Sequence, residues 1–319
     1  MSMENNPVVV HPSAVQRRGY RFGKYLRRTW PLHVLLAPAV LLALIFNYIP
    51  LSGLVIAFQD YKPWLGIRHS PWVGLEHFRY LFTYPDTKQV IINTLVIASM
   101  KIVAQMFVPV IFALLLNEIH NMFVKRLSQT LVYLPHFLSW VILGGILIDV
   151  LSIQGGIINR FLGWFGVEPI FFLANGNWFR FTLVVSDTWK DFGFSTIIFL
   201  ATIVGVSPAL YEAASIDGAN RWEQVRHITL PAIIPIFTVA ATLSLGRVLD
   251  AGFDQVFNLY NPLVYAKGDI IDTFVYRIGL LGAKFSFGTA VGLFKSAVGL
   301  ILIVTSYKLA NKYANYRIF

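Results

Sequence analysis

Long apolar runs alternate with short polar segments along almost the whole chain. A helix needs about 20 mostly apolar residues to cross the hydrocarbon core of a bilayer, and six runs reach that length. The predicted transmembrane helices are His33–Phe58, Val90–Leu116, Leu127–Leu151, Phe179–Val206, Ala232–Val248 and Phe287–Leu309. The pattern therefore predicts an all-α integral membrane protein with about six transmembrane helices.

The composition supports a membrane protein and argues against a nucleic-acid-binding one. Only 13% of the residues are charged, whereas soluble globular domains carry about 25%. The net charge of +10 is dispersed among apolar runs, so we expect membrane lipid and no nucleic acid as a partner. The chain has no cysteine, and His136 and His227 are isolated, so no metal site is predicted.

The distribution of basic residues predicts the orientation. An even number of spans places both termini on one side, and that side carries the larger share of Lys and Arg, including Arg17, Arg18, Arg21, Lys24, Arg27 and Arg28. Basic residues gather on the cytoplasmic side of membrane proteins. We therefore predict that residues 1–30 are a basic cytoplasmic tail, that residues 31–319 form the transmembrane domain, and that both termini are cytoplasmic. The first apolar run is too long for the core of a signal peptide.

A compact polar segment at residues 207–231 interrupts the apolar pattern on the predicted cytoplasmic side. Ser207-Pro208 is typical of a helix start, and Asp217-Gly218 is typical of a turn at a helix end. A second amphipathic piece around Trp222 leads to Leu230-Pro231 and the next span. Spacing alone favours an ordinary amphipathic loop at the membrane surface.

The same segment resembles the EAA loop of ATP-binding-cassette importer permeases. The matching residues are Glu212-Ala213-Ala214, then Gly218, then Ile228-Thr229-Leu230-Pro231. In that family the loop is a coupling helix seated in a groove of a separate ATPase. The resemblance implies a polar contact by Glu212, close packing at Ala213 and Ala214, and a turn at Gly218. The predicted coupling residues are Glu212, Ala213, Ala214, Asp217, Gly218, Ile228, Leu230 and Pro231.

The resemblance also implies partners. The chain has no phosphate-binding loop of the G-x-x-x-x-G-K-[ST] type, so we expect no cofactor and no catalysis here, with ATP and Mg on a partner ATPase. The family uses two ATPase subunits, a homologous second permease and an extracytoplasmic solute-binding protein, in the bacterial cytoplasmic (inner) membrane. The fold expected is that of a type I importer permease. The external loops Asp60–Lys88 and Asp250–Ser286 are candidate docking surfaces for the binding protein.

Three further segments resemble one carbohydrate branch of that family. They are Leu134–Trp140, Asp187–Asp191 and Gly252–Pro262. The branch is related to the maltose permeases and imports complex, often acidic oligosaccharides, including alginate. The resemblance implies an oligosaccharide substrate and favours an acidic, alginate-like one, with a neutral oligosaccharide as the alternative.

Charged residues inside the predicted spans are candidates for the substrate path, because ionisable groups at membrane depth are costly. Asp187 and Lys190 lie three residues apart on one helix, and the structural interpretation is that they pair with each other. The functional hypothesis is that a polar channel is lined by Trp189, Lys190, Asp191, Asp254 and Gln255. Lys101, Arg247 and Lys295 lie in other spans and are expected to snorkel or to pair between helices.

Other classes of protein remain as alternatives. An ion-gradient-driven secondary transporter would use the Asp187–Lys190 region as an ion relay. A membrane-embedded enzyme would need a nucleophile–base constellation, which does not appear near the external face. A channel or scaffold would transport nothing actively.

Overall fold

Helices make up nearly all of the structure, a computed structural model that describes residues 14–314 and the side-chain surroundings of residues 29–308. The long α-helices are α1 (Ala14–Ala43), α4 (Thr87–Glu118), α5 (Met122–Tyr133), α6 (Trp140–Val150), α8 (Gly176–Val204), α11 (Leu230–Leu245) and α15 (Phe285–Ala314). The short α-helices are α2 (Gly66–His69), α3 (Glu76–Thr83), α7 (Ile157–Gly163), α9 (Pro208–Ile216), α10 (Arg221–Gln224), α12 (Phe253–Leu259), α13 (Tyr265–Gly268) and α14 (Ile271–Phe274). Tighter or wider helical turns are η1 (Leu44–Tyr48), η2 (Ile49–Phe58), η3 (Leu134–Phe137), η4 (Val225–Thr229), η5 (Pro262–Val264) and η6 (Val275–Leu281).

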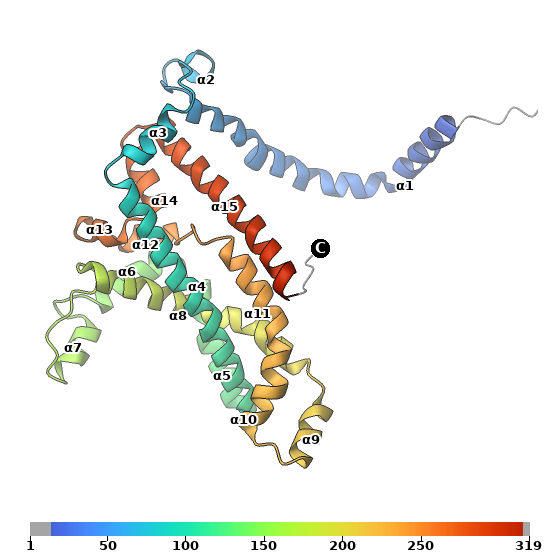
Figure 1. The fold of residues 1–319 in the computed structure, drawn as a ribbon, viewed down its shortest axis with the longest axis vertical. Helices are drawn as coiled ribbons and strands as arrows, with labels where there is room; N and C mark the ends of the chain where they lie inside the picture. Colours follow the sequence, from blue (N-terminus) through green and yellow to red (C-terminus); the bar gives the residue numbers. More distant parts are fainter. Residues whose placement is uncertain (1–13, 315–319) are drawn as a thin grey trace, which may run out of the picture. The chain divides into compact units, whose positions relative to one another are not determined.

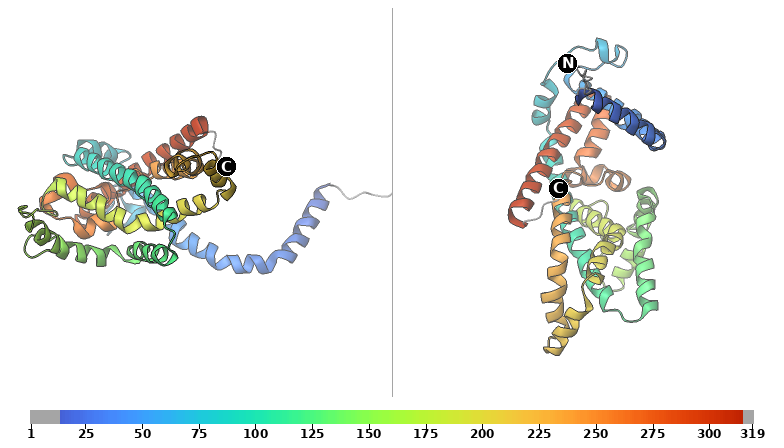
Figure 2. Two further views of the ribbon diagram at one scale, coloured as in Figure 1. Left: turned by 90° about the horizontal axis from the view of Figure 1, so that it is seen from below. Right: turned by 90° about the vertical axis from the view of Figure 1, so that its right-hand side faces the viewer.

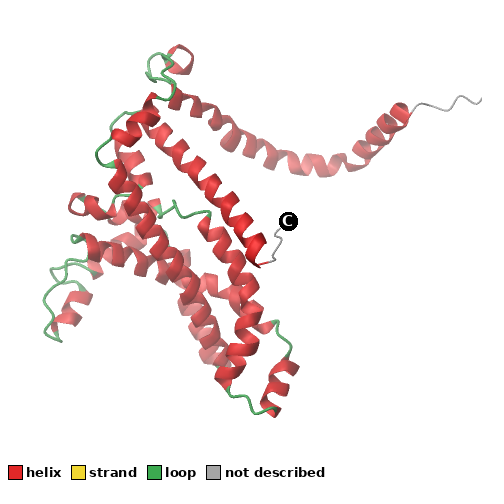
Figure 3. Ribbon diagram, in the orientation of Figure 1, coloured by secondary structure: helices red, strands yellow, loops and turns green. Residues whose placement is uncertain are grey.

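Within the described residues no β-strand forms, and the one isolated bridge joins Gln59 to Trp72. Figure 3 shows helices joined by loops throughout. The predicted all-α class is confirmed.

The chain divides into two compact units, and the boundary between them in the sequence lies between Val55 and Ile56. The first unit is a continuous helical path through α1 and η1, with Pro31 and Pro38 inside α1. Its apolar side chains are open to the surroundings, as Leu35 illustrates with 78% exposure. Apolar side chains of this kind are compatible with contact to lipid. The helix also satisfies the hydrogen bonds of its own backbone, as a lipid environment requires. The predicted boundary at residue 30 stays a prediction.

The second unit is built around α4 and α8, which form its most extensive helix–helix contact. Three buried apolar clusters include residues of α4, and two of them also include residues of α8. One includes Ile97, Phe179 and Val256 and joins α4, α8 and α12. A second joins α3, α4, α14 and α15, and a third joins α4, α8 and α11. The α4–α8 pair is therefore the scaffold against which the other helices are placed.

Most of the predicted spans correspond to long apolar helices. Four helical stretches are long and apolar enough to cross a membrane: Thr29–Phe58, Thr87–Glu118, Arg221–Leu245 and Phe285–Lys308. Two bent helix pairs raise the number to as many as six. The stretch Arg221–Leu245 contains α10, η4 and α11, so the second piece of the polar loop and the following span form one helix.

The third predicted span, Leu127–Leu151, is wrong as a single straight helix. The stretches Met122–Phe137 and Trp140–Val150 are bent by 106° relative to each other. Leu138 has an extended backbone, and Ser139 caps the next helix by accepting a hydrogen bond from the Ile142 N–H at 3.4 Å. Pro135 precedes this break, and a proline disfavours helix continuation where its missing N–H would be needed. The second pair, α8 and α9, is bent by 64°.

The polar loop lies at one end of the second unit. Figures 1 and 2 show α9 and α10 at the opposite end from α3 and α14, with the α4–α8 pair running between the two ends. This arrangement gives the unit two distinct ends and a middle, and each holds a feature described below.

Candidate functional site

The segment 207–231 forms the expected helix–turn–helix. Helix α9 begins at Pro208, although the Ser207 side chain makes no capping hydrogen bond. The turn expected at Asp217-Gly218 is present, because Gly218 has φ +82°, a conformation that costs other L-residues roughly 1–2 kcal/mol. The Ala219 N–H then donates to the Ala214 carbonyl at 2.9 Å, which ends α9 with the usual hydrogen-bond pattern of a left-handed cap.

Side-chain contacts brace this loop against the helix that follows it. Gln224 is buried and donates to the Ser215 hydroxyl at 3.0 Å and to the Ala219 carbonyl at 3.2 Å. The Tyr211 hydroxyl lies 3.0 Å from the Thr229 hydroxyl. Asn220 begins α10 with a capping box, an arrangement that satisfies two free N–H groups at once. Helix α9 is therefore held rigidly on the start of the α10–α11 helix.

The predicted coupling residues divide by exposure. Glu212, Ala213, Asp217, Gly218 and Pro231 are exposed, whereas the others are half-buried: Ala214, Ile228 and Leu230. The loop also exposes large apolar side chains that the motif does not mark, with Ile216 at 86%, Trp222 at 68% and Leu210 at 53%. Exposed apolar groups on a polar segment are typical of a docking surface. Their apolarity is the sequence signal that could have identified them.

A cavity of about 660 Å³, called the central cavity here, lies beside the α4–α8 pair. Its apolar wall comes largely from α11, α4 and α8, and includes Ile236, Val239 and Met106. Its polar wall comes from α4, η3, α8, the end of α11 and the turn after it, and contains Lys101, Gln105, His136, Asp187, Asp191, Ser244, Arg247 and Asp250. The volume falls within the range of about 300–1,000 Å³ that is usual for small-molecule sites.

Lys101 is the centre of one charged cluster at this cavity. Its ammonium group lies 3.0 Å from the Asp187 carboxylate and donates to the Ala251 carbonyl at 2.7 Å. It also donates to the Gln255 side-chain oxygen, while the Gln255 amide donates to the Leu183 carbonyl at 2.8 Å. The cluster thus joins α4, α8 and α12 and satisfies a buried charge on several sides, as burial requires.

The predicted pair of Asp187 with Lys190 is wrong. Asp187 pairs with Lys101 on α4 instead. Lys190 donates to the His136 carbonyl at 2.7 Å and lies 3.8 Å from the Asp191 carboxylate. Two side chains three residues apart on α8 therefore face different neighbours, and each pairs with the neighbour that it faces.

His136 and Asp191 form a second polar cluster. His136 Nδ1 lies 2.8 Å from the Asp191 carboxylate, and the imidazole stacks on Phe194 with ring centroids 4.3 Å apart. Both residues line the central cavity. The cluster fixes the bend at η3 against the middle of α8.

The predicted substrate-path residues are mostly placed elsewhere. Of the five, only Asp191 lines the central cavity. Gln255 is fully buried and engaged with Lys101, Lys190 is buried against η3, and Trp189 is 46% exposed outside the cavity. Asp254 is exposed on α12 and does not line it either. Helical rotation is the physical reason, because neighbouring positions on a helix point about 100° apart.

The cavity lining contains residues that the predicted path lacked. His136, Trp140, Gln105 and Asp250 line it, together with Arg247. His136 and Trp140 belong to the segment Leu134–Trp140, which the sequence marked as a family resemblance and not as part of the substrate path. Lys295, the other charge in a predicted span, pairs with Asp272 at 2.6 Å, as expected for a charge between helices.

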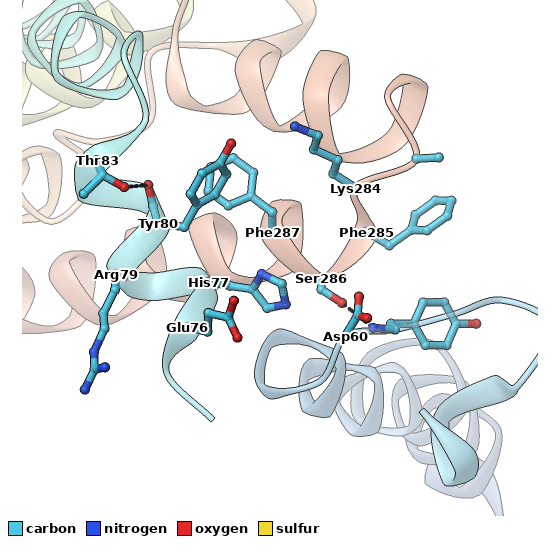
Figure 4. Close-up of a pocket in the computed structure, with 12 residues that line it drawn as sticks. Asp60, Glu76, His77, Arg79, Tyr80, Thr83, Lys284, Phe285, Ser286 and Phe287 are labelled. Carbon is cyan, nitrogen blue, oxygen red and sulfur yellow. Dashed lines mark hydrogen bonds between the residues drawn. The ribbon is translucent and has the colours of Figure 1, made fainter. Parts of the chain in front are cut away.

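A second cavity, called the upper cavity here, has a volume of about 620 Å³ and lies between α3 and the start of α15. Figure 4 shows Asp60, Glu76 and His77 near Ser286, with Tyr80 and Phe287 beside them and Lys284 above. His77 Nε2 lies 3.0 Å from the Gln59 carbonyl, and the Tyr61 N–H donates to Ser286 at 2.9 Å. All the lining residues except Phe287 come from the two loops that the sequence marked as docking surfaces.

A buried ion pair supports the same end of the unit. Asp269 is 2% exposed and pairs with Arg277, and it accepts a hydrogen bond from the Thr273 hydroxyl at 2.7 Å. Burial raises the pKa of the Asp269 carboxyl, while the Thr273 hydrogen bond and the Arg277 charge oppose the shift. Burial, with smaller effects from Tyr265 and Asp269, raises the pKa of Tyr260 to about 12.

Comparisons with known proteins identify relatives along nearly the whole chain. A family model described as "binding-protein-dependent transport system inner membrane component" matches residues 105–314. The chain is 45% identical over 288 residues to the polygalacturonan/rhamnogalacturonan transport system permease protein YteP of Bacillus subtilis (strain 168), covering 90% of each. It is 41% identical over 308 residues to protein LplB of the same organism, covering 97% of each.

A solved structure is also similar. A bacterial ABC transporter involved in the import of the acidic polysaccharide alginate contains a chain that matches with a TM-score of 0.85 and 36% identity. The match covers 92% of the present chain and 99% of that chain. A chain of a bacterial alginate ABC transporter in complex with an alginate pentasaccharide-bound periplasmic protein matches with a TM-score of 0.84 and 36% identity.

Proposed function

Since the chain belongs to the family of binding-protein-dependent transport system inner membrane components, we propose that it is the permease subunit of an ATP-driven importer of acidic oligosaccharides. Its helical fold is that of a type I ABC importer permease. The observation that carries the proposal is that the matched residues 105–314 contain both the braced loop at 207–231 and most of the central cavity.

The loop at 207–231 is proposed to transmit force from the ATPase. The proposed ATPase contacts are Glu212, Ala213, Ala214, Asp217, Gly218, Ile228, Leu230 and Pro231. The exposed side chains of Leu210, Ile216 and Trp222 would enlarge this surface. A rigid loop transmits a movement of the ATPase better than a flexible one does. The hydrogen bonds of Gln224 and Tyr211 make the loop rigid. ATP and Mg would bind to the two ATPase subunits.

The remaining parts of the importer follow from the two ends of the unit. If the loop faces the cytoplasm, α3 and the start of α15 face outward, and the upper cavity becomes a docking site for an extracytoplasmic binding protein. A homologous second permease would complete the path beside the central cavity. We infer that the chain lies in the bacterial cytoplasmic membrane with both termini in the cytoplasm.

ATP binding would close the two ATPases and move the loop with them. Because α9 is fixed on the α10–α11 helix, that movement would shift α11, which forms part of the wall of the central cavity. The cavity would then open outward and receive sugar from the docked binding protein. Acidic sugars are favoured because the relatives include a permease for polygalacturonan and an alginate importer.

The experiment is uptake of labelled oligouronates by proteoliposomes that contain this chain, its second permease, the ATPases and the binding protein. We expect ATP-dependent uptake, and we expect Glu212→Ala to reduce it while weakening co-purification of the ATPase. Glu168→Ala is the matched control, because Glu168 is exposed and lies outside the loop. Uptake that persists without the ATPase, or that follows an ion gradient, would overturn the proposal.

A further inference from the structure

The charged groups of the central cavity differ in how well they are paired. Lys101 and Asp187 lie 3.0 Å apart, and His136 and Asp191 lie 2.8 Å apart. Each of these side chains is thus engaged by a neighbour within the same chain.

Arg247 and Asp250 are the exception. Both line the cavity and both are exposed. Within the described residues, neither side chain makes a hydrogen bond or an ion pair within 4.0 Å, although the Asp250 carboxylate is near enough to Lys101 for their charges to attract. The Asp250 N–H donates to the Arg247 carbonyl at 2.8 Å, so a tight turn after α11 holds both residues at the rim of the cavity.

We propose that Arg247 binds the carboxylate of a uronic acid residue and that Asp250 accepts hydrogen bonds from sugar hydroxyls. Together they select acidic oligosaccharides within the central cavity. The inference rests on the proposed function and adds to it the residues that recognise the acid.

The chemistry of the two side chains fits a uronate. A guanidinium group donates two parallel hydrogen bonds to a carboxylate, which gives both strength and orientation. An ionised Asp only accepts hydrogen bonds, so it suits the hydroxyl groups of the same sugar ring. Trp140 lines the cavity as well, and its aromatic face offers an apolar surface to the ring.

The overall charge of the cavity does not favour anions, and this makes the position of Arg247 decisive. The lining holds two cations, Lys101 and Arg247, and three acids, Asp187, Asp191 and Asp250. Since Lys101 is already engaged by Asp187, the cation left for an acidic sugar is Arg247. Because Arg247 is exposed at the cavity, its guanidinium group is accessible to a ligand there.

The test measures direct binding to the assembled importer without its binding protein, by saturation-transfer NMR. The probes are trigalacturonate, an alginate trisaccharide, and the methyl ester of each, which removes the charge and keeps the ring. We expect Arg247→Gln to weaken binding of the acids about tenfold or more, as for the loss of hydrogen bonds to a charged group. Binding of the esters should stay unchanged, whereas Asp250→Asn should weaken acids and esters alike.

Arg68→Gln is the matched control, because Arg68 is exposed and lines neither cavity. Arg247→Lys keeps the charge and loses the paired donors, so it should bind the acids with intermediate affinity and the esters normally. If Arg247→Gln does not assemble with the other subunits of the importer, Arg247→Lys is the variant that tests the inference. The inference would be overturned if the wild type and both Arg247 variants bound the acids with equal affinity. It would also be overturned if both variants lost the second permease, because Arg247 would then be an assembly contact. If the wild type binds and transports neither acid, the proposed acidic substrate fails instead.

Discussion

Removal of the Lys101 charge should destabilise the second unit strongly, and Lys101→Met is the variant that tests it. The Lys101 and Asp187 side chains are only 7% and 18% exposed, and their charged atoms lie 3.0 Å apart. At that distance and an effective dielectric constant of about 20, the attraction is about 5–6 kcal/mol. Desolvation of both groups offsets much of it.

The expected cost follows from what remains after the substitution. Lys101→Met leaves Asp187 buried without its cation, and breaking a buried pair in this way costs about 3–5 kcal/mol. Asp187→Asn should cost less, about 1–3 kcal/mol, because Lys101 retains the Ala251 carbonyl and Gln255 as acceptors. The double variant should be more stable than Lys101→Met alone, since no unpaired carboxylate remains.

The assay is the free energy of unfolding in mixed detergent micelles, followed by tryptophan fluorescence. Lys88→Met is the matched control on the same helix, because Lys88 is exposed, and it should change the free energy by less than about 0.5 kcal/mol. The reasoning is refuted if Lys101→Met unfolds at the same detergent concentration as the wild type. The reasoning is also refuted if the loss of unfolding free energy in the double variant equals the sum of the losses in Lys101→Met and Asp187→Asn.

Three further substitutions test local packing and the polar loop. Gly193→Ala should lower the unfolding free energy by about 1–3 kcal/mol, because its Cβ would lie 2.3 Å from the Val132 carbonyl oxygen. The control Gly292→Ala, whose Cβ would meet nothing within 4 Å, should not lower the unfolding free energy, because alanine favours a helix more than glycine does; equal losses in the two variants would contradict the steric reason. Gly218→Val should reduce co-purification of the ATPase and uptake more than Gly218→Asn does, because asparagine tolerates the positive φ better; equal effects would show that φ is not the cause. Asn220→Ala should cost about 1 kcal/mol by removing the helix cap, and an unchanged melting temperature would contradict that role.

The apolar pattern was sufficient to predict the long helices because a membrane imposes one simple requirement on sequence. Helices α4 and α15 lie close to the predicted Val90–Leu116 and Phe287–Leu309. The 106° bend between Met122–Phe137 and Trp140–Val150 was not predicted, because apolar residues continue on both sides of it. Ser139 after Pro135 is the local signal for it.

The candidate site was less accessible to sequence reasoning. The loop at 207–231 is local, so its turn at Gly218 and its two helical pieces could be read from neighbouring residues. The central cavity, in contrast, is lined by residues that lie far apart in the sequence. Its wall combines α4, η3, α8 and the turn after α11, and whether Asp191 or Trp189 faces it depends on how α8 is rotated against α4.

The sequence by itself determined the helical class, the long apolar helices, the turn of the polar loop and the family, because each depends on composition or on residues close together in the chain. Only the tertiary structure decided which charges pair. Asp187 and Lys190 are neighbours on α8, yet Asp187 pairs with Lys101 and Lys190 donates to the His136 carbonyl. A buried charge pairs with the partner that packing brings to it, and the packing of α8 against α4 and η3 brought Lys101 to Asp187 and the His136 carbonyl to Lys190.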